Sequence, residues 1–171
     1  ILTSFNWDEI MDEALHIGVD SFLAKPLFAS NVIDEFERVA LCNPQIAFRL
    51  FNNNAPVYDL AATNLRGRIV DVVGKNSKNN LLEVSAETSV VRVEGFVGRP
   101  ASAKKHAKQF LFVNGRYFKS AYFYKAIIKA YEKLIPPSLQ PDIFLYLTID
   151  PEHIDVNVHP QKIEVKFAEA E

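Results

Sequence analysis

Apolar residues recur at every third or fourth position in four segments of the chain, which is the spacing of helices with one buried face. The last of these segments is the clearest, because Tyr124, Ile127 and Ile128 share one side of it. Asparagine lies at the start of the other three, and glycine or proline follows all four, as is usual at helix ends. The pattern predicts helices at residues 7–17, 32–41, 64–73 and 120–134.

The remaining apolar segments are short and bounded by turn residues, which is typical of strands. Segments 46–51 and 56–60 are predicted to form one hairpin, and 81–86 and 89–97 another. Asn114-Gly115 is a strong turn signal after a strand at 109–113, but a helix follows, so we expect the turn to redirect the chain rather than close a hairpin. Further strands are predicted at 1–5, 19–24, 143–149 and 154–167, the last interrupted at Pro160. Because strands and helices do not alternate regularly, the sequence predicts an α+β fold.

Composition narrows the class of protein. A chain of 171 residues with 49% hydrophobic residues can form one main domain with a small annex. No apolar segment is long enough to span a bilayer and no signal peptide is recognisable, so we expect no membrane association and a cytoplasmic location. Cys42 is the only cysteine, and no spacing suits a metal. With neither a nucleophile–base set nor a glycine-rich phosphate loop, we expect no catalytic site in this chain.

Charge is unevenly distributed along the sequence. The net charge is −2, yet residues 99–133 carry 9 Lys and Arg against a single acidic residue, Glu132. Lys125, Lys129 and Lys133 lie at helical spacing and share one face of the last predicted helix. This face is either an ordinary solvated surface or a row of ammonium groups that follows a phosphate backbone. The candidate nucleic-acid contacts are Arg99, Lys104, Lys105, Lys108, Arg116, Lys119, Lys125 and Lys129.

The C-terminal segment DVNVHPQK is the most unusual part of the chain. Asp155, Asn157 and His159 alternate with valines until Pro160 breaks the strand, and Lys162 follows the break. A lysine held by a rigid proline-containing loop is a good phosphate ligand, because its ammonium is a compact charge with three donors. The alternative is an exposed lysine on an edge strand.

Several motifs, in order, are similar to the second domain of MutL-type mismatch-repair proteins. They are EFERVALCNPQIAFRLFNN, LRGRIVDVVGK, VEGFVGRP, QFLFVNGRYF, KAIIKAYEKLIPP and IDPEHIDVNVHPQKIEVKF. The resemblance covers roughly residues 32–171, and we expect the corresponding domain at 31–171. It implies a sandwich like domain 2 of ribosomal protein S5, with a left-handed βαβ crossover. It also makes Asn114, Gly115, Asp155 and Asn157 structural parts of these motifs.

The same resemblance implies a function without turnover in this chain. Lys162, with His159 and Pro160, would reach the terminal phosphate of ATP held with Mg by an adjacent GHKL ATPase domain. The implied partners are DNA, that ATPase domain, a MutS-like mismatch-recognition protein and a second copy of the chain. One position departs from the family: Ala121 stands where many bacterial members have a DNA-contacting arginine.

Residues 1–28, within a predicted annex at 1–30, resemble the last part of a two-component receiver domain. Thr3 matches the switch hydroxyl of such domains and Lys25-Pro26 the phosphate-contacting lysine with its proline, but the phosphoacceptor site has no counterpart. We interpret this segment as an annex to the main domain. Two other functions therefore remain open: a two-component signalling protein, and a general basic nucleic-acid-binding module of the S5-like class.

Overall fold

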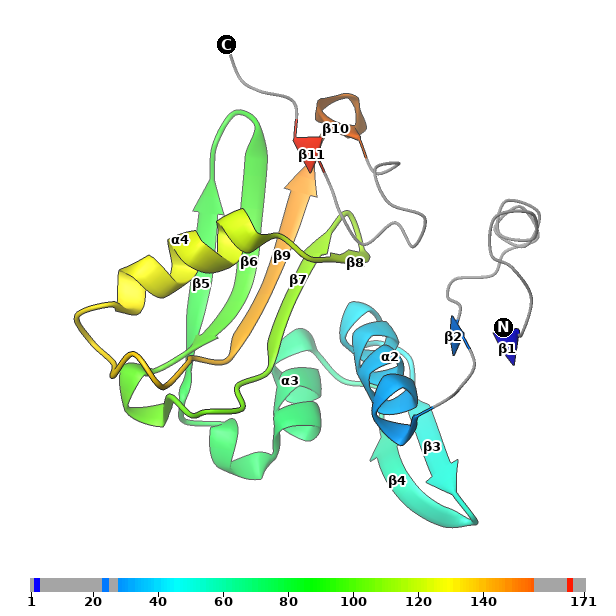
Figure 1. Ribbon diagram of the computed structural model, residues 1–171. Coiled ribbons are helices and arrows are strands. Elements are labelled where there is room, and N and C mark those ends of the chain that lie inside the picture. Colours follow the sequence, from blue (N-terminus) through cyan, green and yellow to red (C-terminus); the bar gives the residue numbers. More distant parts are fainter. Residues whose placement is uncertain (1, 4–22, 25–27, 156–165, 168–171) are drawn as a thin grey trace.

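A five-stranded mixed sheet forms the centre of the molecule in the computed structural model, which describes residues 2–3, 23–24, 28–155 and 166–167 (Figure 1). The strand order is β5-β6-β9-β7-β8, and all neighbours are antiparallel except β7 and β9. The strands are β5 (Leu81–Glu87), β6 (Val91–Gly98), β7 (Gln109–Val113), β8 (Arg116–Phe118) and β9 (Ile143–Ile149). The α+β class predicted from the sequence is confirmed.

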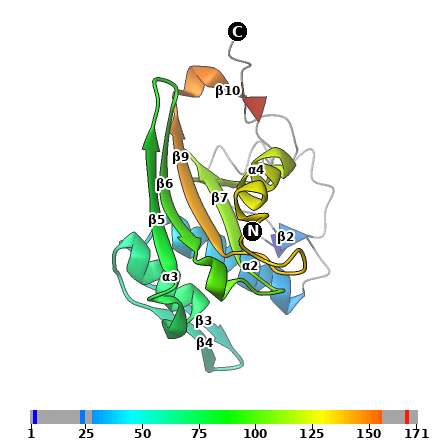
Figure 2. The same ribbon diagram turned by 90° about the vertical axis from the view of Figure 1, so that its left-hand side faces the viewer.

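Helices cover both faces of this sheet (Figures 1 and 2). On one face lie α2 (Ala29–Cys42) and α3 (Leu65–Val73), and on the other lies α4 (Ala121–Tyr131). Short 3-10 turns, η1 (Lys75–Ser77), η2 (Pro100–Ser102) and η3 (Pro151–His153), connect the larger elements. No helix among the described residues is both long and apolar enough to cross a membrane.

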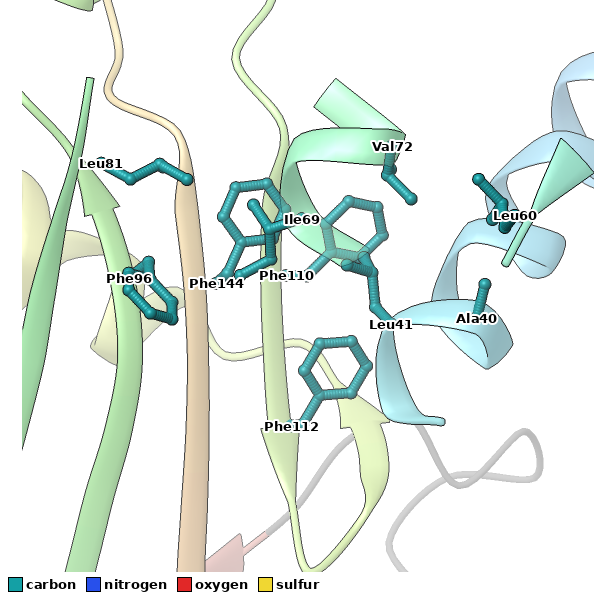
Figure 3. Packing of buried hydrophobic residues seen from close by; sticks show 10 residues of the cluster. All are labelled: Ala40, Leu41, Leu60, Ile69, Val72, Leu81, Phe96, Phe110, Phe112 and Phe144. Carbon is teal, nitrogen blue, oxygen red and sulfur yellow. The ribbon is translucent and has the colours of Figure 1, made fainter. Parts of the chain in front are cut away.

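Two apolar cores fill the layers of this sandwich, one on each side of the sheet. Figure 3 shows the core under α2 and α3, where Leu41 and Ile69 pack on Phe110, Phe112 and Phe144. These phenylalanines alternate with residues that face α4, because successive strand side chains point to opposite faces. The second core is Leu111, Val113, Phe118, Ile143, Leu145, Leu147 and Ile149, covered by Phe123, Tyr124 and Ile127 of α4.

The helix ends follow local side-chain chemistry. The Asn64 side chain accepts a hydrogen bond from the Gly67 amide (2.8 Å) and begins α3, and Gly74, at φ +115°, ends it. The Ser120 hydroxyl oxygen accepts from the Phe123 amide at the start of α4. The prediction for α4 was three residues too long: the helix ends at Tyr131, and Leu134 is 62% exposed. Ile135, which lies beyond the end of the helix, is buried.

Among the described residues, three smaller strand pairs accompany the main sheet. The hairpin β3 (Phe48–Asn52) and β4 (Ala55–Leu60) was predicted, and Asn53 and Asn54 turn it with positive φ. Near the C-terminus, β10 (Ile154–Asp155) pairs antiparallel with β11 (Lys166–Phe167). Near the N-terminus, β1 (Leu2–Thr3) pairs parallel with β2 (Leu23–Ala24). The helix predicted at 7–17 lies outside the described residues.

The prediction for Asn114-Gly115 was wrong. These residues close a hairpin between β7 and β8, in which Val113 pairs with Arg116. Both turn residues have positive φ, +47° and +78°, as a two-residue hairpin turn of this kind requires. The strand β8 has only three residues before α4 begins, which is too short to recognise from periodicity.

The β7–α4–β9 connection is a crossover between parallel strands. In Figure 1 both strands point upward, α4 lies in front of the sheet, and β9 stands to the left of β7. The crossover is therefore left-handed, which is rare among such connections and agrees with the implied S5-like fold.

Candidate nucleic-acid interface

The helix α4 presents basic side chains on its outer face. Lys125 and Lys129 are exposed, whereas Phe123, Tyr124 and Ile127 point into the core beneath. Neither ammonium group forms an ion pair with a described carboxylate. With Lys119 before the helix and Lys133 after it, both exposed, they form what we call the α4 row.

Tyr122 lies in the middle of the α4 row, and its side chain is 77% exposed. Exposed aromatic rings beside cations are a common feature of surfaces that bind nucleic acid, because bases stack on them. This residue was not among the contacts predicted from the sequence. Its signal was present, since Tyr122 is an aromatic residue between Lys119 and Lys125 that falls outside the apolar stripe of the helix.

Arg116 is exposed at the start of β8, directly after the Asn114-Gly115 turn. Asn114 holds that turn to the central strand. Its side chain donates to the Ile149 carbonyl oxygen (2.8 Å) and accepts from the Ile149 amide (3.0 Å), and its own amide donates to the Leu147 carbonyl oxygen (2.9 Å). The turn, and with it Arg116, is thus tied to the end of β9.

Two of the predicted contacts, Lys104 and Lys108, bind carboxylates within the protein. Lys104 Nζ lies 2.8 Å from Asp142 Oδ2, and Lys108 Nζ donates to Glu37 Oε1. Glu37 is only 1% exposed and also accepts from the Tyr58 hydroxyl (2.5 Å), while Asp142 accepts from the Lys108 amide (2.8 Å). Both ammonium groups offset buried charge, so less of their charge is available to an external anion than in the α4 row.

The other two predicted contacts before β7 form no ion pair with a described carboxylate. Lys105 is exposed. Arg99 is exposed and anchored, because its Nε donates to the Asn79 carbonyl oxygen (3.2 Å). The structure therefore divides the predicted set into exposed cations and the internally paired Lys104 and Lys108.

Burial raises the pKa of several titratable groups beside the core. Burial, and secondarily Glu35, raises the pKa of the Cys42 thiol to about 12, so the thiol stays protonated near neutral pH. Burial and the hydrogen bond to Glu37 raise the pKa of Tyr58, and burial raises the pKa of Tyr146. Among residues with described side chains, no group of three His, Cys, Asp or Glu could hold a metal ion.

The C-terminal motif is described only in part. Asp155 belongs to β10, where its backbone pairs with Lys166. Asn157, His159, Pro160 and Lys162 lie outside the described residues. Their predicted role in contacting a nucleotide phosphate stays a prediction.

Comparison with known protein families places this chain among repair proteins. The family described as "DNA mismatch repair protein, C-terminal domain" matches residues 69–171. The DNA mismatch repair protein MutL of Parabacteroides distasonis is 53% identical over 138 residues, and that of Bacteroides fragilis is 48% identical over 139. These alignments cover 80% and 81% of this chain but 22% of each relative. The chain spans about a fifth of the length of the curated relatives it matches.

Solved structures of low sequence identity share the fold. The N-terminal domain of a DNA repair protein has a TM-score of 0.69 at 18% identity, covering 81% of this chain and 46% of that one. The Aquifex aeolicus MutL ATPase domain complexed with ADP has a TM-score of 0.51 at 23% identity, covering 71% and 42%.

Proposed function

The chain belongs to the MutL family of DNA mismatch repair proteins, and from that premise we propose that it is the transducer domain of such a protein. In this role the domain binds DNA through its basic surface and senses ATP held by an adjacent GHKL ATPase domain. The observation that carries the DNA-binding part is the α4 row, four exposed lysines without an ion pair to a described carboxylate in a chain of net charge −2.

The physical argument for DNA is electrostatic. Each lysine that approaches a backbone phosphate releases condensed counterions, which makes binding favourable and strongly dependent on salt. Lys125 and Lys129 are one helical turn apart, about 6 Å along the axis. Phosphates of one strand recur about every 3.4 Å of duplex axis, so each lysine can approach a separate phosphate. Arg116, directly after the β7–β8 turn, lies three positions before Lys119, the first lysine of the α4 row. The exposed Tyr122 ring can stack on an unpaired base.

The nucleotide-sensing part rests on the motif DVNVHPQK and on the fold. We place Lys162 at the terminal phosphate of ATP, with His159 and Pro160 shaping its loop and Asp155 and Asn157 fixing the strand before it. The fold shared with a MutL ATPase domain that was solved with ADP supports this placement. The ATPase domain of the same protein would supply the nucleotide and Mg, and this chain would contribute one ammonium group and no turnover of its own.

The rest of the proposal concerns organisation. We propose a main domain at 31–171 and an annex at 1–30, because the MutL relatives match 138 to 140 residues of the chain. A MutS-like protein, DNA and a second copy of the chain are the proposed partners, in the cytoplasm of a bacterial cell.

We test the DNA-binding part with Lys125→Gln combined with Lys129→Gln. If each lysine contacts one phosphate, the slope of log affinity against log salt falls by roughly 2, and affinity falls about tenfold or more at moderate salt. The measurement is fluorescence anisotropy with labelled duplex and single-stranded DNA. The matched control, Arg49→Gln with Arg92→Gln, removes two arginines that are paired with Asp59 and Glu94 and should leave both quantities unchanged. Equal effects of the two double variants would exclude the α4 row as a specific contact.

A further inference from the structure

Helix α3 lies on the opposite face of the sheet from α4 (Figure 2). A second group of basic side chains comes from the first turn of α3, from the loop after this helix and from the residue after β6. Arg66, Lys75, Lys78 and Arg99 are all exposed. The segment from 64 to 80 that supplies three of them contains one acidic residue, Asp71. The folded chain brings Arg99 to this segment, and we call the group of four the α3 corner.

Two arginines of the α3 corner are fixed to consecutive carbonyl groups of one loop. Arg66 Nη2 donates to the Lys78 carbonyl oxygen (2.9 Å), and Arg99 Nε donates to that of Asn79 (3.2 Å). The Arg99 amide also donates to the Asn80 carbonyl oxygen (2.7 Å). Side chains from α3 and from the end of β6, 33 positions apart, thus meet at the same three residues.

The loop that receives these bonds is itself held in place. The Ser77 amide and hydroxyl both donate to the Gly74 carbonyl oxygen, at 2.9 and 2.7 Å, and Asn80 Nδ2 donates to the Asn76 carbonyl oxygen (3.1 Å). The Arg66 guanidinium also lies over the Phe96 ring, 5.5 Å from its centroid. Because both arginines are positioned before any ligand arrives, binding an anion would order fewer groups.

The arginines of the α3 corner differ in what they contact from two other exposed arginines, Arg49 and Arg92. Arg49 is paired with Asp59 at 3.0 Å, and Arg92 with Glu94 at 2.5 Å. Neither Arg66 nor Arg99 forms an ion pair with a described carboxylate. A guanidinium has five N–H donors in a planar fork that suits phosphate, and the bonds to the loop carbonyls leave most of these donors free.

The α3 corner is connected to the α4 row around the end of the sheet. The Tyr131 hydroxyl, in the last turn of α4, donates to the Gly98 carbonyl oxygen (2.7 Å). Gly98 directly precedes Arg99, so the end of the α4 row and the start of the α3 corner are fixed to each other. This buried hydrogen bond therefore sets the position of Arg99 relative to the end of α4.

We propose that Arg66, Arg99 and Lys78 form a second backbone-phosphate contact for DNA, which extends the α4 row around the end of the sheet. This inference rests on the proposed DNA-binding function and adds to it a longer contact. Because the donors are guanidinium and ammonium groups that meet phosphates and no base edge, the contact is independent of sequence.

The test compares three variants of the full chain by fluorescence anisotropy with a labelled random-sequence duplex between roughly 50 and 200 mM salt. They are Arg66→Gln with Arg99→Gln, Lys75→Glu with Lys78→Glu, and the control Arg49→Gln with Arg92→Gln. The Lys75/Lys78 variant leaves the packing of Arg66 on Phe96 intact, so it reports on charge even if the arginine variant unfolds. We expect both corner variants to lower the salt slope by roughly 1 to 2 and the affinity about tenfold, with the control unchanged.

The outcomes separate this inference from the proposed function. Normal binding by both corner variants, with weakened binding by Lys125→Gln/Lys129→Gln, would overturn the α3 corner and leave the α4 row in place. Normal binding by all of these variants would overturn DNA binding by the domain and the α3 corner with it. If the corner variants keep full DNA affinity but lose binding to poly-glutamate, the site is one for acidic protein and the inference is wrong.

Discussion

Gly95 lies in the middle of β6, where the backbone passes very close to the central strand. Its φ is +143°, a backbone conformation that residues other than glycine rarely adopt. A Cβ atom at this position would lie 2.0 Å from the Phe144 carbonyl oxygen. The neighbouring residue Phe96 belongs to the core under α3. The absence of a side chain at this one position therefore allows β6 and β9 to pair.

Gly95→Ala should lower the free energy of unfolding by about 2–5 kcal/mol, because backbone strain and steric overlap add. Gly74→Ala is the matched control: its φ is +115°, but no atom lies within 4 Å of the place its methyl group would take, so strain alone should cost about 1–2 kcal/mol. Urea denaturation followed by circular dichroism measures both. Equal losses in the two variants would contradict the role given to Phe144.

The exposure of some single residues could be predicted from the sequence, whereas their long-range contacts could not. The exposure of Lys125 and Lys129 followed from helical spacing, because the apolar residues between them had to face a core. The pairing of Lys108 with Glu37 did not, since 71 positions separate them and only the packing of α2 beside the sheet brings them together. The loop contacts of Arg66 and Arg99 depend on tertiary structure in the same way.

At the scale of elements, the Asn114-Gly115 turn connects more than its own hairpin. The turn closes β7 and β8, and the Asn114 side chain forms two hydrogen bonds with Ile149 at the end of β9. The sequence predicted the turn but not the pairing that follows it, because β8 has only three residues before α4. The other helices and strands of residues 28–149 were predictable from periodicity, since each has a long apolar stripe or a bounded apolar segment.

Asn114→Ala should lower the free energy of unfolding by about 2–3 kcal/mol, because it removes both bonds to Ile149 and strains a residue at φ +47°. Asn53→Ala is the comparison, since Asn53 turns the β3–β4 hairpin at φ +48° without a side-chain hydrogen bond to another strand of the described residues. That change should cost about 1 kcal/mol. Thermal and urea unfolding would measure the difference. A loss at Asn114 no greater than that at Asn53 would show that the bonds to β9 contribute nothing.

At the scale of the whole molecule, the basic residues fall into two groups: those paired with buried carboxylates and those exposed on the surface. Lys104 joins the loop before β7 to Asp142 before β9, and Lys108 joins the loop before β7 to Glu37 of α2. The side chains of the α4 row and of the α3 corner are exposed. The β10–β11 pair lies beyond the far end of β9 from these loops (Figure 1). In the proposed function, ATP sensing belongs to the segment between β10 and β11, and DNA contact to the sandwich.

Lys162→Ala in the full-length protein should lower ATP hydrolysis by about tenfold or more, because the variant removes one cation proposed to stabilise the terminal phosphate. Steady-state release of phosphate measures this, and the melting temperature of the isolated chain should not change. Lys166→Ala, four residues further on, is the control and should hydrolyse ATP at the normal rate. A normal rate of ATP hydrolysis by Lys162→Ala would contradict the nucleotide-sensing part of the proposed function.

The position of β9 in the sheet has a consequence for synthesis of the protein. This strand is the third of five, yet it is the last of them to leave the ribosome, after both β5–β6 and β7–β8. Until residue 149 emerges, β6 and β7 each keep an unpaired edge, and such edges readily pair with other chains. A nascent chain whose β9 has not yet emerged would therefore be a target for chaperones or for aggregation, whereas one whose β9 has emerged could already complete its central sheet.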